Sequence, residues 1–307
     1  IGTNAMATDV YSNGTVAVGY QALYTQNYTG ATDSLNTALG YAAGYAVTTG
    51  TSNTFIGALA GDATTTSTEN TAVGESALTL NTTGGYNTAV GRNALAANTT
   101  ADQNTALGRL ALYANTTGAY NTAVGASAMQ SVTTASNLTA IGYQALDACT
   151  TGANNLALGS GALTTCTTGS GNIAIGINTG ASLTTGTNNY MAGLAAAGSV
   201  TTGHSNVIIG YAAGDAITTG NGHVMMGYNA GTAMTTNTQC TLIGYEAGDQ
   251  ITTGANNTCI GGHAGGALTT GAQSVAIGTS ALLAATTPTN STCVGHDAGK
   301  AITTGDS

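Results

Sequence analysis

The chain has 307 residues, of which only 5% are charged, with 46 glycines, one proline, one phenylalanine and no tryptophan. The formal net charge is −9 with three Lys and Arg residues in total, which excludes nucleic-acid binding through phosphate contacts. Aliphatic residues are too plentiful for a disordered chain, and no run of apolar residues is long enough for a membrane-spanning helix.

One five-residue phrase recurs along the whole chain. At Asn87–Gly91 it reads Asn-Thr-Ala-Val-Gly, and its glycine, the anchor glycine, returns every 17 residues from Gly40 to Gly295. The step from Gly19 to Gly40 is 21 residues, so we expect a four-residue insertion near residues 27–34. With the first anchor the chain contains 18 units, which we interpret as a single repeat domain over its full length.

Each unit predicts a short strand followed by a turn. Thr-Ala-Val-Gly alternates over a few residues and ends in glycine, and a Thr-Thr pair, often followed by glycine, forms a second corner eight residues after the anchor. Seventeen residues cannot hold two packed helices, and glycine, threonine and asparagine disfavour helix. We therefore expect an all-β fold, a parallel β-solenoid or β-roll of about 18 coils.

Two positions in each coil compensate for each other in volume. Four residues after the anchor stands a leucine or methionine or else a glycine, and seven residues after it stands the complement, as in Leu78 with Asn81 and Gly214 with Ile217. Close-packed interiors require this kind of balance. The pair Gly61 and Thr64 is small at both positions and predicts an underfilled coil.

The strand alternation leads us to predict an oligomer interface. If the aliphatic residue before each anchor points inward, its predecessor points outward. That outward column is uncharged and apolar, and such exposed patches mark protein–protein contacts. The alternative is that this column faces the coil interior and the chain is a monomer. The candidate interface residues are Phe55, Ala89, Ala106, Ala123, Met191, Ile208, Met225 and Leu242.

Two further features bear on assembly and surface chemistry. Neither end of the repeat has the polar cap that solenoids normally need, so we expect a longer fibre or end-to-end stacking into a filament. Asparagine is the commonest residue four before the anchor, which predicts a stacked amide ladder. Asparagines in Asn-x-Ser/Thr sequons are candidate glycosylation sites, among them Asn81, Asn98 and Asn115.

The repeat phrases resemble those of known repeat families. The segment Asn121–Ala128 resembles the Asn-Ser-Val-Ala-Ile-Gly repeats of trimeric autotransporter adhesin heads. The longer phrase seen at Thr48–Gly57 and Asn206–Gly214 resembles the repeat shafts of bacteriophage tail fibres and related secreted bacterial repeat proteins. The resemblance implies a left-handed coil and side-by-side association, and it is specific for architecture rather than function.

Chemistry-bearing residues do not form a predicted active site. Cys149 and Cys166 share a column within disulfide range, although we interpret the five cysteines as small hydrophobic thiols. The four histidines fall in different columns, and the column of Asp62, Asp147, Asp215 and Asp249 is a weak calcium candidate. Glu75 and Arg92 should form a surface ion pair. We therefore expect no enzyme, no cofactor and no metal.

These observations predict a structural subunit or shaft of an extracellular fibre, on a cell surface or a virion. Its partner would be itself, as a trimer or a filament packed side by side or end to end. The alternative is a cell- or glycan-binding adhesin head whose exposed Thr, Asn and Tyr columns hold surface glycans or a host receptor. A third interpretation, an ice-binding solenoid, would use the Thr-Thr column, but adjacent threonines on a strand point to opposite sides. The tyrosine columns contain Tyr20, Tyr41, Tyr143, Tyr211, Tyr228 and Tyr245.

Overall fold

The computed structural model describes residues 1–303, and the last Thr-Thr-Gly residues, Thr304 and Gly305, lie outside this range. The chain divides into two compact units, each described by itself. Unit 1 is Ile1–Ala153 and unit 2 begins at Asn154.

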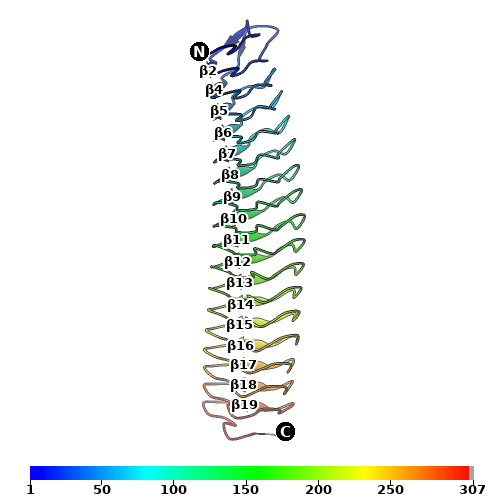
Figure 1. The fold of residues 1–307 in the computed structure, drawn as a ribbon. Coiled ribbons are helices and arrows are strands. Elements are labelled where there is room, and N and C mark those ends of the chain that lie inside the picture. Colours follow the sequence, from blue (N-terminus) through cyan, green and yellow to red (C-terminus); the bar gives the residue numbers. More distant parts are fainter. Residues whose placement is uncertain (304–307) are drawn as a thin grey trace. The chain divides into compact units, whose positions relative to one another are not determined.

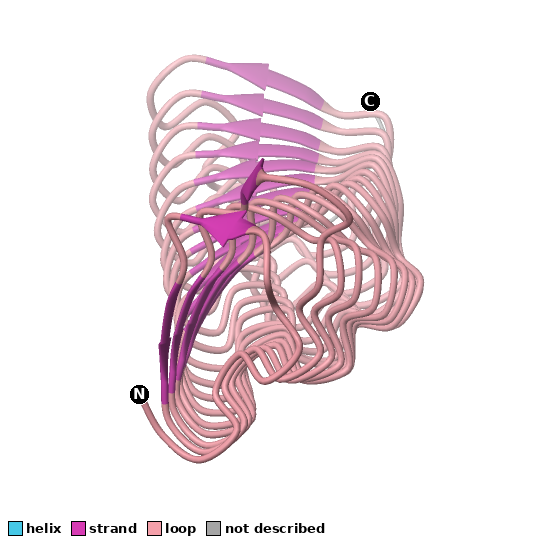
Figure 2. Ribbon diagram, turned by 90° about the horizontal axis from the view of Figure 1, so that it is seen from above, coloured by secondary structure: helices cyan, strands magenta, loops and turns pink. Residues whose placement is uncertain are grey.

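The predicted parallel β-solenoid is confirmed in both units, with one three-residue strand per turn directly before the anchor glycine (Figures 1 and 2). Neighbouring strands pair in parallel and in register, so each residue of a strand lies beside its equivalent in the next turn. The strands of unit 1 are β2 (Val16–Val18), β4 (Thr37–Leu39), β5 (Thr54–Ile56), β6 (Thr71–Val73), β7 (Thr88–Val90), β8 (Thr105–Leu107), β9 (Thr122–Val124) and β10 (Thr139–Ile141). Those of unit 2 are β11 (Leu156–Leu158), β12 (Ile173–Ile175), β13 (Tyr190–Ala192), β14 (Val207–Ile209), β15 (Val224–Met226), β16 (Thr241–Ile243), β17 (Thr258–Ile260), β18 (Val275–Ile277) and β19 (Thr292–Val294).

The long step between Gly19 and Gly40 is accommodated at the start of unit 1. Two short strands, β1 (Ser12–Asn13) and β3 (Thr32–Asp33), pair there in parallel outside the main sheet. The buried Tyr28 hydroxyl donates to the Gly50 carbonyl at 2.7 Å, which ties this segment to the next turn.

The orientation predicted for the strand residues is wrong. The middle residue of every three-residue strand points into the coil, and the first and last residues point outward. All eight candidate interface residues are fully buried within the single chain: Phe55, Ala89, Ala106, Ala123, Met191, Ile208, Met225 and Leu242. Their side chains therefore cannot contact another copy, and the alternative that this column faces the interior is the correct one for its orientation.

Volume compensation explains why alanine is inside and the larger aliphatic residue is outside. Buried leucines such as Leu78 and Leu95 reach the interior from the position four after the anchor and leave room only for alanine on the strand. Where the strand carries a large inward side chain, that position is glycine, except in the Met191 turn, where it is the buried Ala197. A Cβ at Gly61 would lie 2.3 Å from the Phe55 ring, and one at Gly248 would lie 2.8 Å from Leu242. The Gly61 coil is thus not underfilled, because Phe55 occupies its space.

The asparagine ladder is confirmed and runs through the buried interior. The Asn87 backbone N–H donates to Asn70 Oδ1 at 3.0 Å, and Asn87 Oδ1 in turn accepts the Asn104 N–H at 3.0 Å. The Asn87 Nδ2 donates to the Ala101 carbonyl at 2.9 Å. Each side-chain amide therefore accepts a backbone N–H and donates to a backbone carbonyl of the next turn, as buried polar groups must be paired.

The Thr-Thr column forms a second ladder on the far corner of the coil. The first threonine of the pair is half-buried or exposed, and its hydroxyl donates to the carbonyl of its equivalent in the next turn, as from Thr82 to Thr99 at 2.9 Å. The second threonine, such as Thr83, is exposed. The two threonines of a pair therefore differ in burial, and the less exposed one bonds along the column.

Candidate functional site

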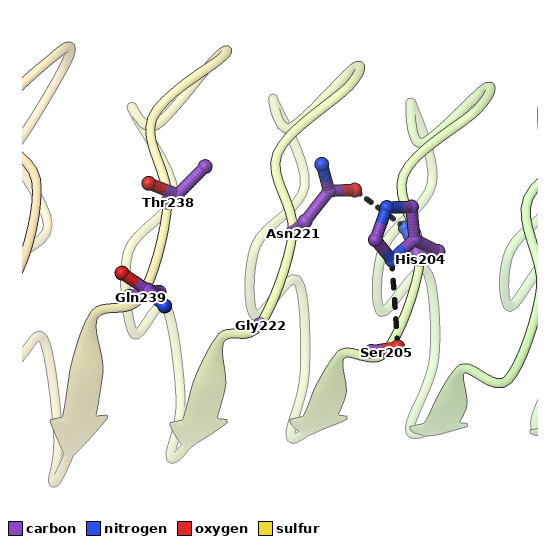
Figure 3. A pocket seen from close by; sticks show the side chains of 6 residues that line it. All are labelled: His204, Ser205, Asn221, Gly222, Thr238 and Gln239. Carbon is purple, nitrogen blue, oxygen red and sulfur yellow. Dashed lines mark hydrogen bonds between the residues drawn. The ribbon is translucent and has the colours of Figure 1, made fainter.

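A surface pocket of about 320 Å³ lies in unit 2, where three successive turns carry polar side chains (Figure 3). Its lining residues directly precede the ladder position in each turn, which is Asn206, His223 and Cys240 here: His204, Ser205, Asn221, Gly222, Thr238 and Gln239. Gly222 has no side chain, and therefore leaves a hollow between Ser205 and Gln239 in the turns on either side.

Hydrogen bonds hold the pocket's walls in place. The Asn221 Oδ1 accepts the His204 backbone N–H at 2.8 Å, and His204 Nδ1 lies 3.4 Å from the Ser205 hydroxyl (Figure 3). A parallel bridge joins Asn221 to Thr238. No lining side chain is acidic, so the pocket offers neutral hydrogen-bonding groups and one exposed imidazole, a set suited to a small uncharged polar ligand.

Beneath the pocket, a histidine takes the place of a ladder asparagine. His223 is fully buried; its Nδ1 accepts the Cys240 N–H at 3.2 Å, and its Nε2 donates to the Asn237 carbonyl at 2.9 Å. These are the bonds that an asparagine amide makes elsewhere in the ladder, and they require the neutral ring. Burial lowers the pKa of His223, which keeps it neutral.

The outward strand faces differ between the two units. In unit 1 the first residue of β4 to β10 is always threonine, from Thr37 to Thr139, beside an aliphatic last residue. Within the described chain these seven hydroxyls have no hydrogen-bond partner in the protein. In unit 2 the first residue is apolar in β11 to β15, which makes both outward columns apolar there.

The column after the anchor glycine differs only in part. Both units carry tyrosines there, including the stacked pair Tyr20 and Tyr41 in unit 1, but Glu and Arg occur in this column only in unit 1. In unit 1 it contains Glu75 and Arg92, whose predicted ion pair is confirmed at 3.1 Å between Oε2 and Nε. In unit 2 it contains Tyr211, Tyr228 and Tyr245, whose rings stack at 5.2 Å between successive centroids. Stacked rings cover each other's faces and present their edges to solvent, so this ladder does not offer the flat faces on which sugars stack.

The candidate glycosylation sites are buried. Asn81, Asn98 and Asn115 are fully inaccessible, and each Nδ2 donates to a carbonyl three residues later at 2.9 to 3.0 Å. They fill the interior opposite the leucines of their coils. The folded chain therefore does not present these sequons for modification, contrary to expectation.

The remaining predicted residues do not converge. All five cysteines are buried thiols, and Cys149 and Cys166 bond the carbonyls of Gly152 and Gly169 through their sulfur atoms. Burial raises the pKa of the Asp62 and Asp147 carboxyls. Among residues 1–303 no three His, Cys, Asp or Glu side chains come together as a metal site would require. The same residues include no helix long and apolar enough to cross a membrane.

Comparisons with protein-family models, curated proteins and solved structures found no match. The sequence signal for the apolar face of unit 2 was present, since Leu156, Ile173 and Tyr190 replace the usual threonine. Placing the larger aliphatic strand residue inside hides this signal, because it turns the first strand residue inward as well. The sequence signal for the pocket is a pair of polar residues before the ladder position in three successive repeats, with glycine as the second residue of the middle pair.

Proposed function

We propose that this protein is a structural subunit of an extracellular fibre or filament, acting through stiffness and self-association and without catalysis. The observation that carries this proposal is the set of ladders that run along the turns. The buried amide ladder is unbroken from Asn36 to Asn121 in unit 1 and from Asn155 to His223 in unit 2. Strand pairing, the buried amide ladder and the threonine ladder repeat from turn to turn within each unit, so bending or opening one turn disturbs three sets of bonds together.

Electron microscopy and sedimentation of the purified chain test this proposal. We expect filamentous assemblies whose amount rises with the protein concentration. Immunogold labelling of the native source should place the chain on a cell surface or a virion, as the resemblance to adhesins and tail fibres implies. A compact monomer at every concentration, with label confined to the cytoplasm, would contradict the proposal.

The pocket supports a second candidate, an adhesin that binds neutral glycans. Asn221, Gln239 and His204 offer amide and imidazole groups of the kind that bond sugar hydroxyls. A glycan array probed with the wild type and with Gly222→Gln tests this candidate. Gln239 has a left-handed backbone like that of Gly222, so glutamine fits the backbone and fills the hollow. Glycan signals that survive unchanged in Gly222→Gln would exclude the pocket.

The outward threonines of unit 1 support a third candidate, an ice-binding protein. Thr88 and its equivalents form a regular, uncharged row of hydroxyls beside a row of aliphatic side chains. Inhibition of ice recrystallisation by the wild type, lost in Thr88→Lys and kept in Thr83→Lys on the other corner, would support it. Equal inhibition by all three proteins would exclude this face.

A further inference from the structure

Unit 2 carries an exposed apolar patch on and beside strands β12 to β15. Besides Tyr190 at the start of β13, six of its exposed members come from the last strand column and from the column after the anchor glycine: Ile175, Ile177, Leu194, Tyr211, Met226 and Tyr228. Their exposed fractions lie between 37% and 50%. Taking about 200 Å² for a fully exposed large side chain, these six present roughly 500 Å² of mainly apolar surface.

The patch is continuous, because half-buried apolar residues fill the sheet between its exposed members. Val207, Ile209 and Val224 occupy the outward positions of β14 and β15. With them the area approaches the roughly 800 Å² that each partner contributes to a standard protein interface. It also reaches the size at which an exposed apolar patch on a monomer marks a binding surface.

The patch is ordered and uncharged before any partner arrives. The Tyr211 and Tyr228 rings stack with an interplanar angle of 8°, which fixes both side chains and lowers the entropy lost on association. No charged residue occupies the outward strand positions or the position after the anchor in these turns. In unit 1 the turns of β6 to β8 carry Glu75, Arg92 and Arg109 after the anchor and threonine at the first strand position, so the surface of those turns is more polar.

We propose that this apolar patch is where a second copy of the chain docks, with sheet face against sheet face. A sheet whose side chains repeat about every 4.8 Å is matched best by another sheet with the same spacing, and packed sheets lie about 10 Å apart. A second copy supplies that spacing and the same patch, which allows a two-fold symmetric contact. This inference rests on the proposed fibre function, and it identifies the surface through which the first two copies of the chain associate.

Sedimentation velocity over a concentration series tests the patch with Met226→Lys and a matched control, Leu107→Lys. Both residues end a strand, and their exposed fractions are 39% and 47%, but Leu107 lies in unit 1 beside threonine. We expect Met226→Lys to weaken self-association about 100-fold or more, because a lysine would be desolvated without a partner. Leu107→Lys should associate like the wild type, and Met226→Leu should retain association.

Far-UV circular dichroism establishes that each variant keeps the fold of the wild type. Should Met226→Lys associate as the wild type does, the patch is wrong while the fibre proposal survives through another surface. Equal weakening by Leu107→Lys would also overturn the patch. A wild type that stays monomeric at high micromolar concentration overturns both proposals.

Discussion

The anchor glycine supplies the sharpest test of the fold, through substitution of Gly261 by alanine. Its φ is +130°, a region that residues with a side chain rarely adopt. A Cβ there would lie 2.6 Å from the carbonyl carbon of Gly278 and 2.7 Å from its oxygen. Those atoms are backbone, and Gly278 is itself held by a 2.7 Å bond from its N–H to Ile260 O, so the next turn must move to admit the methyl group.

The cost follows from these two effects. Holding alanine in this backbone region costs about 1–3 kcal/mol. Displacing the turn breaks or lengthens the two ladder bonds that flank the site, Gly261 N–H to Ile243 O and Gly278 N–H to Ile260 O, at about 1 kcal/mol each. We therefore expect Gly261→Ala to lower the free energy of unfolding by about 3–5 kcal/mol.

The adjacent residue provides the control. A methyl group at Gly262 would have no atom within 4 Å, and the backbone there has no positive φ. Gly262→Ala should therefore be neutral or should stabilise by up to about 1 kcal/mol through the unfolded chain. Urea unfolding followed by circular dichroism compares the two variants, and hydrogen exchange at the Gly278 amide reports the local opening. A difference below about 0.5 kcal/mol between the variants would refute the steric reasoning.

Three further outcomes are expected. Because the folded-state pKa of His223 is lowered, the unfolded chain binds a proton first as the pH falls, and the free energy of unfolding decreases below about pH 6.5. In urea unfolding measured over a pH series, His223→Asn should remove that decrease. An unchanged pH profile would contradict this expectation. Burial raises the pKa of Cys259 to about 12, so the thiol of the folded chain should resist alkylation at pH 8. The free energy of unfolding should decrease by about 1.4 kcal/mol per pH unit between about pH 9 and 12, because the unfolded chain loses the thiol proton first. Rapid alkylation of the native protein would count against this. Phe55→Ala should cost about 3–5 kcal/mol in urea unfolding, because the glycines around the ring, Gly44 and Gly61, cannot fill the cavity; a loss below about 1 kcal/mol would show that the turns collapse into it.

The repeat made the architecture predictable from the sequence. A strict 17-residue period predicts the register of every strand from Thr37 onward. The asparagine column predicts the amide ladder, because stacked turns place equivalent amides in contact. The paired volumes of Leu78 with Asn81 correctly indicated a shared interior. Each of these inferences used spacing alone, which a solenoid converts directly into position.

The direction of the strand residues could not be obtained from the rule that larger apolar residues face inward. The coil is thin, and Leu78 and its equivalents fill it from the opposite side, so the strand can place only alanine inside. The signal that resolves this lies in a third column: Phe55 and Leu242 occur where Gly61 and Gly248 make room. The sequence does not indicate the pocket for a different reason, since its hollow comes from the side chain that Gly222 lacks.

The two-sided filling of the interior has a consequence for how such a chain changes over generations. A turn with leucine on one side and a turn with isoleucine on the other present the same strand, the same anchor and the same ladder positions to their neighbours. Recombination between repeats can therefore add or remove whole turns without redesigning a core. Selection can then adjust the number of copies separately from the chemistry displayed on any one of them.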